Sequence, residues 1–205
     1  VLDVSVSENG VPIRFEVFDR GDYLRIQWYY SASSESRAFE IRYRLVKALN
    51  VFRDVAELNW KVWGDGWDSS LRELSGEIVL PEKVGDPKEV FSWGHPEING
   101  KIGLVENQRL IFQAFNIPSG QWVEIRIVFP ASLLSSAEFA NVKNGEGLSK
   151  IISEEESFVF WEKAGAIVPW VLAVLFLLSL VLIYFRFGRD PVVFLDSIYE
   201  REPPF

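Results

Sequence analysis

The chain has 205 residues, a formal net charge of −8 at pH 7, no cysteine and 15% aromatic residues. The lack of cysteine excludes disulfides, thiolate metal sites and cysteine nucleophiles. An acidic chain without a basic stripe does not suit a nucleic acid partner, and the aromatic content is too high for a disordered chain.

The first 130 residues predict a series of short antiparallel strands. Apolar and polar residues alternate in them, which predicts one buried and one solvated face, and turn-forming residues separate them. We therefore predict a mainly β fold, with an antiparallel β-sandwich over residues 1–130. The sequence leaves its topology open, immunoglobulin-like or other, because there is no cysteine pair. The expected strands lie at 13–17, 24–30, 39–45, 51–63, 71–80, 109–115 and 123–129.

Carboxylates and tryptophans are most concentrated between residues 52 and 68. Two carboxylates can act as the acid and base of a glycosidase, and tryptophan rings can stack on sugars. In the alternative reading, the tryptophans fill the core or pack on a turn, and the acids cap turns or pair with basic neighbours. On a continuous strand the odd spacing of Asp54 and Glu57 places them on opposite faces, which does not converge them on one substrate. The candidate binding residues are Asp54, Glu57, Trp60, Trp63, Trp67 and His95.

His95 is the single histidine of the chain and cannot form a histidine-rich metal site. We expect it to hold a turn by hydrogen bonds. The acidic loop 65–68 lacks the spacing of an EF-hand, and no Gly-x-Ser-x-Gly motif is present. The sequence therefore predicts no catalytic residue, no metal and no cofactor.

Residues 131–163 are predicted to form a linker and a juxtamembrane stalk. Ser153 followed by Glu156 fits a capping box, so a helix is expected from about residue 154 to 187. Within it, residues 164–185 carry no charged side chain. A helix over this run is about 33 Å long, enough to cross a hydrocarbon core of about 30 Å. The sequence therefore predicts one transmembrane helix and the lipid bilayer as a partner.

The flanks of this run predict the orientation. Arg186 and Arg189 follow it directly, whereas Lys163 is the one basic residue close before it. Basic residues near a span are retained in the cytoplasm. We therefore expect the N-terminal part to lie outside the membrane and residues 186–205 to be cytoplasmic. Since an exported domain needs a leader or an upstream span, we expect one before Val1.

Three stretches resemble a family of bacterial and archaeal predicted membrane proteins, domain of unknown function 2207. Residues 52–60 contain Asp54-x-Ala56-Glu57-Leu58-x-Trp60, which is similar to a signature of that family. Residues 78–81 read Ile-Val-Leu-Pro, and residues 187–191 read Phe-Gly-Arg-Asp-Pro, with Tyr199 and a Pro-Pro pair further on. The resemblance implies a membrane-anchored ectodomain of the cell envelope, and no catalytic residue comes with it.

Two functions follow as hypotheses, and a third possibility is a domain accessory to a transporter or sensor formed by further spans. The first is a membrane-anchored, extracytoplasmic domain that binds a protein partner or an envelope component such as a glycan. The alternative is an enzyme that acts on envelope polysaccharide through Asp54 or Glu57. An open groove lined by tryptophan and two nearby carboxyls would favour the enzyme, whereas buried tryptophans and ion-paired acids would favour the binding domain.

Overall fold

The computed structural model describes residues 1–21 and 24–188. The chain divides into two compact units, Val1–Lys150 and a second that begins at Ile151. The first unit consists of β-strands and short 3-10 turns up to the start of a helix that forms the second. The predicted class is confirmed, namely antiparallel sheets followed by one long apolar helix.

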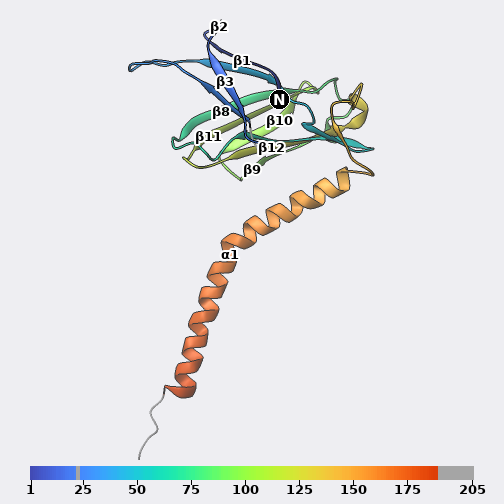
Figure 1. Cartoon of the computed structure of the whole chain (residues 1–205). Helices are drawn as coiled ribbons and strands as arrows, with labels where there is room; N and C mark the ends of the chain where they lie inside the picture. The colour runs from blue at the N-terminus through green and yellow to red at the C-terminus, as the bar shows by residue number, and fades with distance from the viewer. Residues whose placement is uncertain (22–23, 189–205) are drawn as a thin grey trace, which may run out of the picture. The chain divides into compact units, whose positions relative to one another are not determined.

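The first five strands form two small sheets of their own, which Figure 1 shows in blue. One has the order β2-β1-β5 and the other is the hairpin β3-β4, and all their pairings are antiparallel. Their bounds are β1 (Leu2–Glu8), β2 (Val11–Pro12), β3 (Phe15–Asp19), β4 (Leu24–Trp28) and β5 (Phe39–Arg44).

β5 corrects one expectation from the sequence. Its alternating pattern predicted a buried face, yet Ile41 and Tyr43 on that face are 36% and 44% exposed. The strand lies at the edge of a three-stranded sheet. Alternation shows that a strand has an apolar side, but it does not show whether another layer covers that side.

The other eight strands form two further sheets, with orders β10-β11-β8 and β13-β6-β7-β12-β9. Every pairing is antiparallel except the short parallel pair of β13 with β6. The 3-10 turns Pro87–Glu89 and Ala131–Leu133 lie outside the strands. The bounds are β6 (Leu49–Val51), β7 (Val55–Trp63), β8 (Leu71–Val79), β9 (Phe91–His95), β10 (Gly100–Val105), β11 (Arg109–Ile117), β12 (Val123–Pro130) and β13 (Asn141–Val142).

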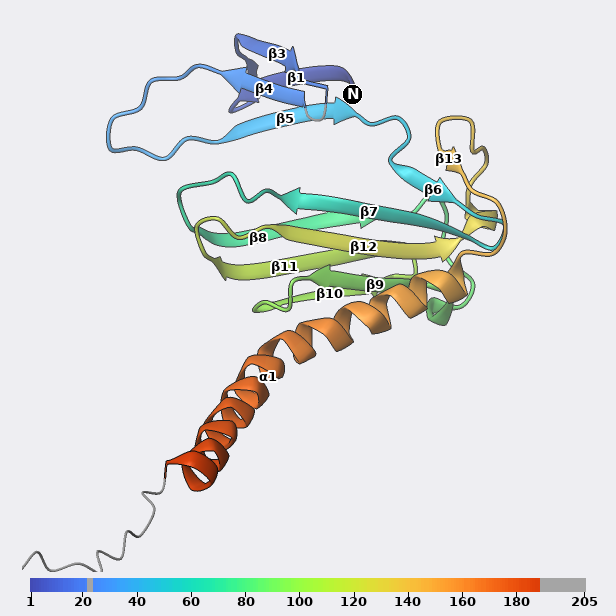
Figure 2. The same cartoon turned by 60° about the horizontal axis from the view of Figure 1, so that its bottom comes forward.

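The main core lies between these two sheets, which face each other in Figure 2. Ile125 and Ile127 of β12 pack in one cluster with Leu110 and Phe112 of β11. Gly76 of β8 makes room for this packing, because a Cβ there would lie 2.3 Å from the Phe112 ring. Alternating apolar residues of two sheets thus share one core, as in a β-sandwich.

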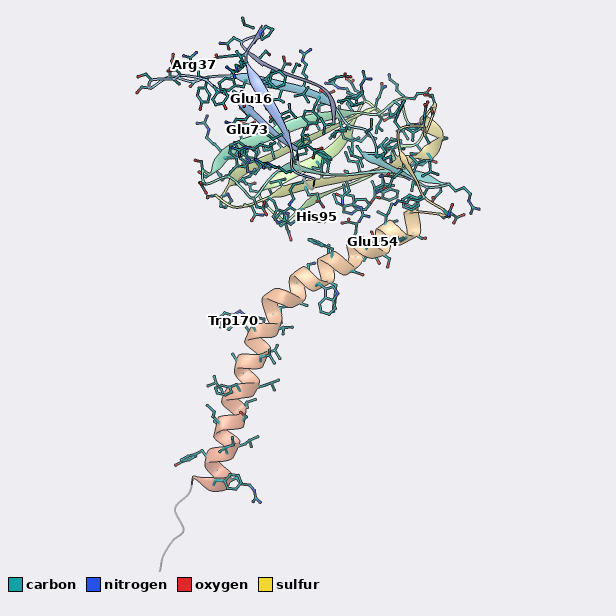
Figure 3. All side chains as sticks on the ribbon, viewed as in Figure 1. Glu16, Arg37, Glu73, His95, Glu154 and Trp170 are labelled. Atoms are coloured by element: carbon teal, nitrogen blue, oxygen red, sulfur yellow. The ribbon has the colours of Figure 1, made fainter. Side chains whose placement is uncertain are left out.

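The helix α1 (Leu148–Phe187) is long and apolar enough to cross a membrane. Its side chains are exposed from residue 167 to 187, and Trp170, labelled in Figure 3, is 75% exposed. The predicted capping box is wrong, because Ser153 lies inside the helix, which begins six residues before the expected start. Arg189 and the residues after it, including the rest of the third resemblance stretch, lie outside the described part of the chain.

Candidate functional site

Asp54 lies just before β7 and caps the start of α1. Its carboxylate accepts hydrogen bonds from the backbone N–H of Gly147 at 2.7 Å and of Leu148 at 3.1 Å. The first N–H groups of a helix have no partner within it, and an acceptor there stabilises the end. The cap therefore comes from a residue more than ninety positions away, which explains why the sequence motif at Ser153 was misleading.

These bonds also change the acidity of Asp54. Partial burial favours the neutral carboxyl, but the N–H groups of Gly147, Leu148, Asp54 and Val55 hold the pKa of Asp54 below its ordinary value. The carboxylate form is the one that accepts these bonds, so Asp54 stays ionised at neutral pH. Such a group is a poor general acid.

Glu57 lies near the start of β7 and is only 4% exposed. Its Oε1 accepts a hydrogen bond from Arg126 Nε on β12 at 2.6 Å, and its Oε2 accepts one from Asn50 Nδ2 on β6 at 3.0 Å. A buried carboxylate needs such partners, because an unpaired buried charge costs several kcal/mol. The carboxylate of Glu57 therefore ties three neighbouring strands together.

The three tryptophans of the 52–68 segment occupy different surroundings. Trp60 packs half-buried against the main core. The rings of Trp63 and Trp67 stack on each other, with centroids 4.8 Å apart and planes 11° apart, and Trp67 is 51% exposed. We call the pair Trp63 and Trp67 the aromatic patch.

Hydrogen bonds fix the loop that carries the patch. The Trp67 carbonyl accepts from the N–H of Gly120 at 3.0 Å and from Ser119 Oγ at 3.2 Å. The loop after β7 is thereby joined to the turn before β12. On the same strand as Trp63, Lys61 Nζ lies 5.5 Å from the centre of the Trp122 ring, a cation–π distance.

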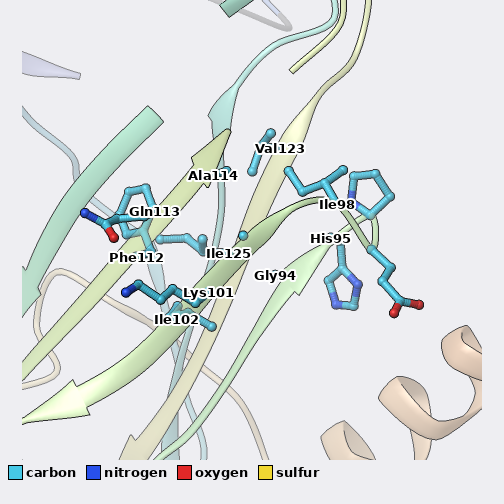
Figure 4. Close-up of a pocket in the computed structure, with 13 residues that line it drawn as sticks. Gly94, His95, Ile98, Lys101, Ile102, Phe112, Gln113, Ala114, Val123 and Ile125 are labelled. Carbon is cyan, nitrogen blue, oxygen red and sulfur yellow. The ribbon is translucent and has the colours of Figure 1, made fainter. Parts of the chain in front are cut away.

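His95 ends β9 and is 9% exposed. It is one of the residues around a cavity of about 250 Å³ between β9 and β10 (Figure 4). These are edge strands of the two facing sheets. Among the described residues, no cluster of three or more histidine, aspartate or glutamate side chains could hold a metal ion.

The cavity is the feature that sequence reasoning missed. Its walls include Phe112 and Ala114 of β11 and Ile125 of β12, which are all buried, together with Gly94 of β9. The one sequence signal is Gly94 inside the strand pattern Phe-Ser-Trp-Gly-His, because an interior glycine marks a place where a side chain is missing. The structure does not bring the six sequence candidates together. Asp54 caps a helix, Glu57 pairs with Arg126, and His95 lines the cavity.

A model of the family described as "Predicted membrane protein (DUF2207) N-terminal domain" matches residues 2–129. Comparison with curated proteins found no match. Comparison with solved structures found no match either.

Proposed function

The chain belongs to the DUF2207 family of predicted membrane proteins, and we propose that its β unit is an extracytoplasmic, non-enzymatic binding domain anchored by α1. In this proposal the β-sandwich covers residues 1–130, a linker and stalk cover 131–163, the span covers 164–185, and residues 186–205 are cytoplasmic. The family and the apolar helix support the membrane anchor. The arginines that follow the apolar run support the orientation.

The observation that carries the binding role is the aromatic patch. An indole ring that is 51% exposed and stacked on a second ring is held flat and rigid at the surface. Such a surface offers a large contact area to a ligand. Binding costs little side-chain entropy, because stacking on Trp63 already fixes the Trp67 ring. A flat apolar face of this kind suits the face of a sugar ring, so the proposed ligand is a glycan of the cell envelope.

The alternative, an enzyme that cleaves envelope polysaccharide, receives no support from the carboxylates. Asp54 is held ionised by backbone donors, and Glu57 is bonded to Arg126 and Asn50. A glycosidase needs one carboxyl group with a raised pKa and a second that faces the same sugar. Neither residue is placed to serve as that acid.

Two experiments test the proposal. Reporter fusions at residues 150 and 195 measure the orientation, and a cytoplasmic signal at residue 150 would refute it. For binding, the full chain in lipid nanodiscs is mixed with insoluble cell-envelope glycan and sedimented. Trp67→Ala should lower retention at least tenfold, whereas Tyr30→Ala, which removes a similarly exposed aromatic ring elsewhere, should not. Equal retention of parent and Trp67→Ala would exclude the patch as the binding surface.

A further inference from the structure

We propose that the cavity between β9 and β10 is a binding site for one hydrocarbon chain, such as the acyl chain of a lipid or a fatty acid. This inference is independent of the aromatic patch and of the orientation of the protein. It rests on how the two sheets end, on the chemistry of the cavity walls and on the place of Gly94.

The two facing sheets are not joined along this side. β9 is the last strand of one sheet and β10 the last strand of the other, and no ladder of hydrogen bonds connects them within the part of the chain that the structure describes. A sandwich of this kind is filled by side chains from both inner faces. Where a side chain is missing at an open edge, the core is accessible from solvent.

Gly94 is the place where a side chain is missing. It pairs with Ile125, a core residue of β12, so its missing side chain would point between the sheets. A Cβ built there meets no atom within 4 Å. Figure 4 shows Gly94 beside Ile125, its partner on the same sheet, with Phe112 of the facing sheet beyond it. The space beside it, about 250 Å³, is open to solvent on one side and reaches core residues on the other.

The inner walls select an apolar ligand. Phe112, Ala114, Val123 and Ile125 are each at most 9% exposed and all line the cavity. A sugar or a peptide backbone placed against these four side chains would lose its hydrogen bonds to water there, whereas the polar lining residues Glu97, Lys101 and Gln113 suit the polar head of a ligand. The space between the sheets suits several methylene groups in a row, and its open side leaves the polar head of the ligand in water.

The membrane anchor supplies the ligand. Because α1 ties the β unit to a bilayer, acyl chains are present at a high effective concentration next to it. Each methylene group that enters the cavity should raise the affinity about fourfold until the space is filled. A bilayer lipid and a free fatty acid carry the same chain, and the experiment below separates them.

The experiment uses the full chain in lipid nanodiscs, with isoleucine methyl groups labelled for NMR. In one arm the nanodisc contains phosphatidylcholine with a nitroxide on its acyl chain. In the other arm a nitroxide-labelled fatty acid is added to nanodiscs of unlabelled lipid. We expect the nitroxide to broaden the methyl signals of Ile102 and Ile125, which line the cavity. Broadening in the first arm identifies a membrane lipid as the source, and broadening in the second alone identifies a free fatty acid.

A matched pair of glycine variants makes the test specific. Gly94→Leu fills the cavity and should reduce the broadening at least tenfold. Gly103→Leu, on the neighbouring strand β10, also finds no atom within 4 Å of its Cβ but does not line the cavity, so it should leave the broadening unchanged. The methyl signal of Ile127, a core residue with 0% exposure, reports whether each variant is folded. If Gly94→Leu does not fold, Ala114→Leu fills the cavity from β11.

Two results would overturn the proposal. One is the absence of broadening in both arms, and the other is broadening that persists in the folded cavity-filling variant. In the first case, a shift of the Ile102 and Ile125 methyl signals by indole would assign the cavity to an aromatic side chain of a partner protein.

Discussion

Replacing Asp54 by alanine should destabilise the β unit by about 2 kcal/mol. The change removes the acceptor of the Gly147 and Leu148 N–H groups, which lie 2.7 and 3.1 Å from the carboxylate. Loss of a helix cap costs about 0.5–2 kcal/mol. Because two donors are left without their acceptor here, the upper end of this range applies. Asp54→Asn keeps one acceptor oxygen and should cost about 1 kcal/mol.

Thermal unfolding of the full chain in nanodiscs, followed by tryptophan fluorescence, measures this loss. For a chain of this size about 1 kcal/mol corresponds to about 2–4 °C in Tm, so Asp54→Ala should melt about 4–8 °C below the parent. Hydrogen exchange of the Gly147 and Leu148 amides should become faster in the same variant. Asp65→Ala, which removes an exposed loop carboxylate, serves as the control. If Asp54→Ala melts like the parent and both amides stay protected, the capping role is refuted.

The lowered pKa of Asp54 adds a dependence on pH. A carboxyl group whose pKa is lower in the folded chain stabilises the fold fully above its unfolded pKa, which is about 3.9. That contribution is lost as the pH falls below this value and through the lower folded pKa. The difference in Tm between the parent and Asp54→Asn should therefore be constant near neutral pH and shrink in acid. A difference that grows as the pH falls would contradict the assignment.

Three further predictions follow from the burial of single side chains and from the division of the chain. Glu57→Ala should lower the free energy of unfolding in urea by about 3–5 kcal/mol, because it removes the carboxylate that pairs with Arg126, whose side chain is 12% exposed. An unchanged free energy of unfolding would show that the pair contributes nothing. Trp60→Ala should lower the free energy of unfolding by about 3 kcal/mol, because it leaves a cavity in the core, whereas Trp67→Ala should change it by less than about 0.5 kcal/mol. Equal effects would contradict the placement of Trp60 against the core and of Trp67 at the surface. A chain that ends at Lys150, the end of the first unit, should give a mainly β circular dichroism spectrum, and a mainly helical one would refute its autonomy.

The sequence predicted the elements whose pattern is long and regular. β12 is an example, because Ile125 and Ile127 alternate with charged residues and both are buried. The apolar run from residue 164 to 185 likewise lies within α1. In both cases the local pattern is enough. Apolar and polar residues that alternate predict a strand, and a long uninterrupted apolar stretch predicts a membrane helix.

The remaining features depend on partners that are distant in the sequence. The residues near Gly147 do not predict that a helix begins there, because the side chain that caps the helix belongs to Asp54. The ion pair of Glu57 needs Arg126 on another strand, which no spacing rule identifies. The cavity beside Gly94 exists because two sheets end together, and edge positions are a property of topology and not of local pattern.

The pairing of early strands with late ones sets an order on the synthesis of the chain. β7 is hydrogen-bonded to β12, so Ala56 meets Phe129 only after most of the β unit has been made. Asp54 receives its donors later still, when Gly147 and Leu148 emerge just ahead of the apolar run. Until then β7 pairs with β6 alone and its other edge is open, and open strand edges are prone to aggregate. The β unit therefore completes its pairing only as the apolar helix begins to emerge.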